Sequence, residues 1–218
     1  MALRRQQLDV MDAIATTRAM RYLSPDPIPE EVLWDILEAA TLGPSAGNQQ
    51  HWGWVVVRDA ETKRQIAEWY REGFALNYGA RRAELATADA SSDLTGANFR
   101  GSEYLAHHIT DAPVWVFAVL RRTAASTSPL AGSSIYGAVQ NLMLAARAHG
   151  IGSTITSNYV RHEADVARLL GLPEDARTFA LIPLGYPARG AFSRPRRLPV
   201  DEVVHWDHWG TLRPRGGT

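Results

Sequence analysis

The chain has 218 residues, with 23 lysines and arginines against 23 aspartates and glutamates, and no cysteine. The balanced charge argues against nucleic acid or an anionic membrane surface as the main partner. The missing thiols exclude disulfides, cysteine zinc sites and iron–sulfur clusters. We expect one domain over residues 1–218 in the cytoplasm, because the sequence lacks a secretory signal and no apolar run approaches the roughly 20 residues that span a bilayer.

The first half of the chain shows helical and strand spacings in turn. Apolar residues predict a helix over about residues 6–17 and a second helix that ends at Gly43. The β-branched and aromatic run 52–57 predicts a strand, and Asp59 is expected to cap a third helix. From about 78 to 102 the pattern weakens to irregular helix and loop.

The second half repeats this alternation and ends in a tail. We expect a short helix from residue 102, a strand over 113–120, a helix from 135 to near 150, a strand over 151–156, a helix that stops near 171 and a strand over 179–185. The tail, about residues 189–218, combines arginines with an apolar cluster and shows no periodicity. It is typical of an extended arm that docks on a partner subunit.

The stretch GPSAGNQQHW, residues 43–52, joins the second helix to the first strand. Its small residues allow backbone N–H groups to approach a planar or anionic ligand, while Ser45 and Asn48 offer polar contacts. The plain alternative is a helix cap and a tight turn. The stretch also matches the G-x-S-x-G motif of serine hydrolases, but that motif needs the order strand, turn, helix, and the expected order here is helix, turn, strand.

Two other groups of residues suggest ligands. Arg18 and Arg21 stand three apart, so both guanidinium forks can face one phosphate or carbonyl edge, unless they form an ordinary solvated pair. The pairs His107-His108 and His205-x-x-His208 lack a third ligand, so we expect no metal.

Several of these pieces, in this order, resemble the flavin-dependent nitroreductase family. They are TTRAMR at 16–21, PSAGNQQHW at 44–52, Gln140-Asn141 followed by GIGS at 150–153, and LIPLGYP at 181–187. The resemblance implies an α+β sandwich: a mostly antiparallel central sheet flanked by helices. It also implies an intertwined homodimer with FMN at the interface, in which the C-terminal arm, through about residues 201–206, crosses to the other subunit.

The resemblance also implies which residues hold the cofactor. Arg18 matches a phosphate-binding position, and Arg21 matches the cation beside the flavin N1/C2 carbonyl. Ala19 stands where a small hydroxyl residue is usual, and His51 where a proline is usual. The implied cofactor set is Arg18, Ala19, Met20, Arg21, Pro44, Ser45, Ala46, Asn48, Ser153, Thr154, Arg194, Arg196 and Arg197.

The implied chemistry is a ping-pong transfer of hydride from NADPH or NADH through flavin N5 to an electron-poor acceptor such as a nitroaromatic or a quinone. No catalytic side chain is required. The resemblance also implies that a segment over about residues 70–108 covers the cofactor. We call it the cover segment and expect its residues Tyr70, Phe74, Tyr104 and His108 to form the substrate pocket.

Other functions stay open. The same scaffold resembles flavin-dependent dehydrogenases, ene-reductases and reductive dehalogenases. A serine hydrolase that uses Ser45 and a non-enzymatic flavin-binding protein are alternatives from different classes.

Overall fold

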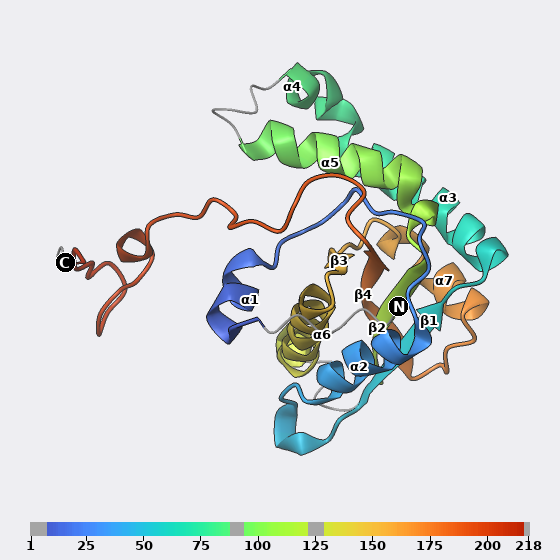
Figure 1. Ribbon diagram of the computed structural model, residues 1–218, viewed down its shortest axis with the longest axis horizontal. Coiled ribbons are helices and arrows are strands. Elements are labelled where there is room, and N and C mark those ends of the chain that lie inside the picture. The colour runs from blue at the N-terminus through green and yellow to red at the C-terminus, as the bar shows by residue number, and fades with distance from the viewer. Residues whose placement is uncertain (1–7, 88–93, 122–128, 216–218) are drawn as a thin grey trace.

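A computed structural model describes residues 8–87, 94–121 and 129–215 and is centred on a four-stranded sheet (Figure 1). Its strands are β1 (Trp52–Val57), β2 (Val114–Arg121), β3 (Gly152–Ser153) and β4 (Ala176–Gly185), in the order β1-β2-β4-β3. Every neighbouring pair is antiparallel. The predicted strands over 52–57 and 113–120 are therefore confirmed, and β2 is central.

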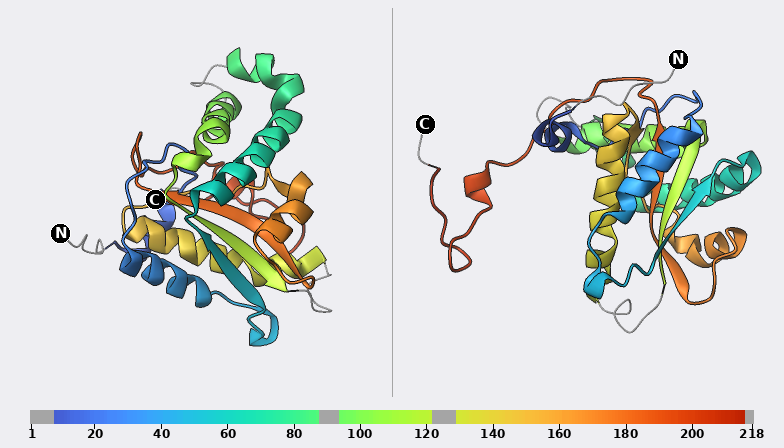
Figure 2. Two further views of the ribbon diagram at one scale, coloured as in Figure 1. Left: turned by 90° about the vertical axis from the view of Figure 1, so that its right-hand side faces the viewer. Right: turned by 60° about the horizontal axis from the view of Figure 1, so that its bottom comes forward.

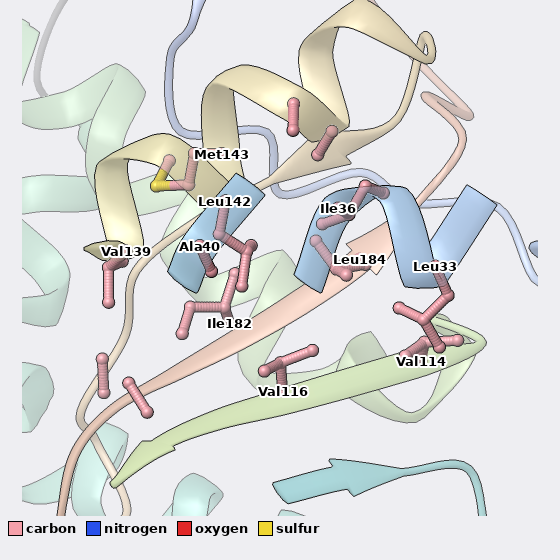
Figure 3. Close-up of a cluster of buried hydrophobic side chains, with 14 of the residues drawn as sticks. Leu33, Ile36, Ala40, Val114, Val116, Val139, Leu142, Met143, Ile182 and Leu184 are labelled. Carbon is pink, nitrogen blue, oxygen red and sulfur yellow. The ribbon is translucent and has the colours of Figure 1, made fainter. Parts of the chain in front are cut away.

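Helices cover both faces of this sheet. One face packs against α2 (Glu30–Thr41) and α6 (Tyr136–Ala148). Figure 3 shows Ile36 and Leu142 of these helices directed toward Leu184 and Ile182 of the sheet. The other face packs against α3 (Ala60–Tyr78), α5 (Leu94–His108) and α7 (Glu163–Leu169) (Figure 2). Because side chains alternate along a strand, β2 is buried on both faces. This arrangement is the predicted α+β sandwich.

The region from 78 to 102 differs from the prediction. Instead of irregular structure followed by a short helix from 102, it contains α4 (Arg82–Thr87) and the longer α5, which begins at Leu94. Gly96 and Gly101 weaken the helical signal, but Phe99 and Leu105 are buried against the α3 side of the core. Tertiary packing therefore extends a helix that local propensity does not indicate.

The predicted strand over 151–156 is also shorter than expected. Only Gly152–Ser153 forms a strand, and Thr156 pairs with Leu181 in an isolated bridge. The carbonyl of Ser153 accepts the Met20 N–H at 2.8 Å, so the chain after α1 (Val10–Thr16) lies along this strand. A short strand leaves the hydroxyl-rich residues after it free of regular sheet pairing.

The C-terminal arm extends away from the sheet in the structure (Figure 1). It contains one turn of helix, Val200–Glu202, and a small loop closed by a bridge between His205 and Leu212. From Leu198 onward its large apolar side chains are exposed, most of all Trp209 at 90%. The predicted extended form is present, and docking on a partner subunit stays a prediction.

Asp59 caps α3, as the sequence predicts. Its carboxylate accepts hydrogen bonds from the Thr62 N–H at 2.7 Å and from the Thr62 hydroxyl at 2.8 Å, which lowers the pKa of Asp59 below its ordinary value of 3.8. A lowered pKa contributes stability above that ordinary value, and the contribution is lost as the pH falls through the folded-state pKa. Asp59→Ala should therefore lower the free energy of unfolding at neutral pH, with the difference from wild type shrinking in acid.

Urea titrations at several pH values measure this difference. Asp59→Asn is the control, because an amide oxygen still accepts the Thr62 hydrogen bonds but does not titrate in this range. A difference between wild type and Asp59→Ala that stays constant down to strongly acidic pH would contradict the assignment.

Candidate functional site

The site is built around the extended segment that follows α1. Residues 18–24 lie between two parts of the chain: Met20 N–H donates to Ser153 O at 2.8 Å, and Ala188 N–H donates to Tyr22 O at 3.0 Å. The side chains of Met20 and Leu23 are buried in the core. These contacts fix the backbone that presents Arg18 and Arg21.

Beside this segment lies a cavity of about 370 Å³, which we call the arginine cavity. Its walls come from residues 18–22, from the first half of α5 and from the root of the C-terminal arm. Six arginines line it: Arg18, Arg21, Arg189, Arg194, Arg196 and Arg197. The predicted phosphate-binding positions from both ends of the chain therefore meet at one place.

The arginine cavity is strongly positive. Among its lining residues, all within the described part of the chain, none is acidic. Arg18 Nη1 donates to Ser193 Oγ at 2.9 Å, and Arg21 Nη1 lies 3.5 Å from Asn98 Oδ1. Burial lowers the pKa of Arg21 and the charge of Arg18 adds to this effect, but an arginine still stays charged at neutral pH. Such a group of guanidinium forks suits a phosphate.

A second hollow of about 190 Å³ shares Arg21 with the arginine cavity. Hydroxyl and amide side chains line much of it, among them Thr154, Thr156 and Asn158. The Tyr70 hydroxyl lies 2.7 Å from Thr156 Oγ1, and burial raises the pKa of Tyr70, so its phenol stays protonated. This polar hollow could receive the hydrogen-bonding edge of a ring system held beside Arg21.

Among the hollows lined by residues of the described ranges 8–87, 94–121 and 129–215, the four predicted substrate-pocket residues line three different ones. Tyr70 lines the polar hollow, and Phe74 lines a separate hollow of about 300 Å³ between α3 and α5. Tyr104 and His108 border a third, open hollow, where the Tyr104 ring lies 4.2 Å from the rings of both Tyr22 and His108. Two rings this close cannot share one face of Tyr104, so neither face of Tyr104 is open to stack on a substrate.

The predicted loop of Pro44, Ser45, Ala46 and Asn48 lies elsewhere. It contains the turn Ala46–Asn48, and the Ala46 N–H donates to Ser134 Oγ at 3.2 Å, just before α6 begins. Ser153 follows the other end of α6, whose 13 residues span about 20 Å. Figure 1 shows this loop beyond the lower end of α2 and the arm root beside α5, with α2 and α6 between them. One copy of the chain therefore does not bring the loop to the arginine cavity.

The structure also bears on the Ser45 alternative. The observed order is α2, the turn Ala46–Asn48 and then β1, which is not the strand, turn, helix order of a nucleophile elbow. Ser45 Oγ accepts the Gln50 N–H at 3.1 Å, as in a tight turn.

In the described residues no group of three metal-ligating side chains occurs. No helix there has the length and apolar content to cross a membrane.

Comparison with known proteins identifies the family. The model of the nitroreductase family matches residues 14–186. The chain belongs to the nitroreductase family. An NADH dehydrogenase of Thermus thermophilus is 32% identical over 209 residues, which cover 91% of this chain and 96% of that protein. The predicted family and the expectation of an oxidoreductase are thus confirmed.

Two solved structures share the fold of this nitroreductase-family chain. An iodotyrosine deiodinase bound to FMN and 3-iodo-L-tyrosine matches with a TM-score of 0.72 at 20% identity, covering 92% of this chain and 100% of the other. A variant of the FMN and NADPH-dependent nitroreductase NfnB from Sphigopyxis sp. strain HMH matches with a TM-score of 0.70 at 22% identity, covering 93% and 100%.

Sequence reasoning missed some lining residues of the arginine cavity, among them Asn98, Gly101 and Arg189. Asn98 and Gly101 stand three apart on α5, so a helix assigned there would have placed them on one face. A Cβ on Gly101 would lie 3.3 Å from Arg21 Cδ, so the small residue makes room for the arginine. Arg189 belongs to the same arginine-rich stretch as Arg194 and carries no separate signal.

Proposed function

We propose that this protein is an FMN-dependent oxidoreductase that uses NADPH or NADH to reduce an electron-poor acceptor such as a nitroaromatic or a quinone. The arginine cavity carries the proposal, because six guanidinium groups without an acidic lining residue in the described chain suit a phosphate monoester. Family membership and the FMN in the names of similar solved structures support it. Bound FMN would supply the hydride carrier that the side chains lack.

The residues present fit such a cofactor. Arg18 and Arg197 would hold the phosphate, since they line the arginine cavity from opposite ends of the chain. Arg21 lies where that cavity meets the polar hollow, so its positive charge would favour negative charge on a ring placed there. Thr154 and Thr156 add hydroxyl groups beside it. On this proposal the side chains bind and orient the cofactor.

We further infer a homodimer in which each copy completes the site of the other. The loop that carries Pro44, Ser45, Ala46 and Asn48 lies about one α6 length from the arginine cavity, so a second copy in the opposite orientation could bring its loop there. The exposed arm has the apolar side chains to cover a neighbour, with Trp206 and Trp209 near its end. Trp34, 65% exposed on α2, adds apolar surface to the body of the molecule.

Reductive dehalogenation is a second candidate, because a solved structure of the same fold binds 3-iodo-L-tyrosine. An ene-reductase or a dehydrogenase would use the same cofactor site.

The first experiment is the visible absorbance spectrum of the purified protein, followed by NADPH or NADH without oxygen. We expect bands of bound FMN that bleach on addition and return when a nitroaromatic or a quinone is supplied. Return with 3-iodo-L-tyrosine alone would favour the dehalogenase. Bound FMN that neither nucleotide reduces would indicate flavin storage, and a colourless protein that takes up no FMN would refute the proposal.

A further inference from the structure

A buried arginine lies under the root of the C-terminal arm. Arg147, near the end of α6, is only 9% exposed. Its Nε donates to Thr16 Oγ1 at 3.0 Å, and its guanidinium carbon lies 4.1 Å from the centroid of the Phe192 ring. Arg147 thus touches both the end of α1 and the arm root, and we call these three residues the Arg147 clamp.

The clamp supports both chain segments that bring arginines to the cavity. Thr16 lies two residues before Arg18, and Phe192 lies directly before Ser193. Arg18 Nη1 donates to Ser193 Oγ at 2.9 Å, so the two segments are joined a second time at the cavity itself. The contacts therefore close a ring that runs from α6 through Thr16 and Arg18 to Ser193 and Phe192, and back to α6.

An arginine is suited to this place. Burial lowers the pKa of Arg147, while the charge of Asp12 acts in the opposite direction. Burying a guanidinium costs free energy unless its donors and its flat face find partners. Here one N–H reaches a hydroxyl and the plane covers an aromatic ring, two contacts that a lysine ammonium does not make together.

Arg194, Arg196 and Arg197 are exposed. Phe192, by contrast, is half-buried and packs against the core on the α3 side of the sheet. Because Phe192 precedes these arginines by only a few residues, its position sets where the guanidinium groups can reach.

We propose that Arg147 is a positioning residue for the phosphate of the cofactor. It holds Phe192, and through Phe192 the arm root that carries Arg194, Arg196 and Arg197, against Arg18. This inference rests on the proposed FMN site, and it adds a residue that does not line the cavity. It predicts a selective effect: loss of the clamp should weaken binding of FMN, which has a phosphate, and not of riboflavin, which has none.

The test compares dissociation constants for FMN and riboflavin by quenching of flavin fluorescence. Arg147→Met and Phe192→Leu should each raise the FMN constant about tenfold, as for a weakened charge-assisted contact, and leave riboflavin within about twofold. Phe192→Tyr keeps the ring and should bind FMN like wild type. Arg177→Met is the matched control. The guanidinium carbon of Arg177 lies 5.4 Å from the centroid of the Phe179 ring, so this variant also removes an arginine from an aromatic ring.

Any one of three results would overturn the inference. Equal weakening of FMN and riboflavin would show general damage to the fold. Unchanged FMN binding in Arg147→Met, together with a loss in Arg197→Gln, would keep the cofactor proposal and remove the clamp. Wild-type protein that binds neither flavin would refute the proposed function, and the clamp with it.

Discussion

Arg18→Ala should raise the dissociation constant for FMN about 10- to 100-fold, the range for removing charge-assisted hydrogen bonds to an anion. Arg18 lines the arginine cavity, and its Nη1 donates a hydrogen bond to Ser193 Oγ at 2.9 Å. The other arginines of the cavity remain in this variant, so binding should weaken and not vanish. Equilibrium dialysis or the flavin content of the purified variant measures the change.

The control for Arg18→Ala is Arg168→Ala, which removes the same charge from an exposed position on α7. Arg168 pairs with Asp165 at 2.9 Å and lies outside the cavity lining. Flavin binding should be unchanged in this variant. Full flavin occupancy in Arg18→Ala would show that the phosphate assignment is wrong.

Gly73→Ala should have the largest effect on stability. Gly73 lies within α3, and a Cβ built on it would overlap the carbonyl oxygen of Asn158. A backbone oxygen cannot rotate away, so α3 must move from the chain that lines the polar hollow. This movement would strain the Tyr70–Thr156 contact of 2.7 Å. We expect a loss of about 3 kcal/mol in the free energy of unfolding, at the upper end for overpacking.

Gly79→Ala, at the end of the same helix, is the matched control. A Cβ there would meet nothing within 4 Å, and the backbone is helical, with φ −55°. Alanine should therefore stabilise by about 0.5 kcal/mol, because it restricts the unfolded chain more than glycine does. Urea titration compares both variants with wild type. Equal, small changes in the two would contradict the close approach of α3 to Asn158.

The sequence by itself was enough to determine the elements whose side chains repeat with one clear period. The run Trp52–Val57 and the apolar run of β2 are strands because β-branched and aromatic residues fill both faces of a buried sheet. Asp59 is a cap because its carboxylate reaches the Thr62 N–H within the same turn. The motifs around Arg18, Ser45 and Ser153 were sufficient for the family, since residue type and order carry that information.

Only the tertiary structure decided where these pieces meet. The length of α5 depends on Phe99 and Leu105 packing against the core, and two glycines hide this in the local pattern. The meeting of Arg18 with Arg194, Arg196 and Arg197 depends on pairing of residues 22–24 with 186–188, contacts between opposite ends of the chain. The separation of the Ser45 loop from that cavity depends on the length of α6. Long-range packing decides the extent of α5 and the meeting of the two chain segments at the arginine cavity, and no local spacing records either of them.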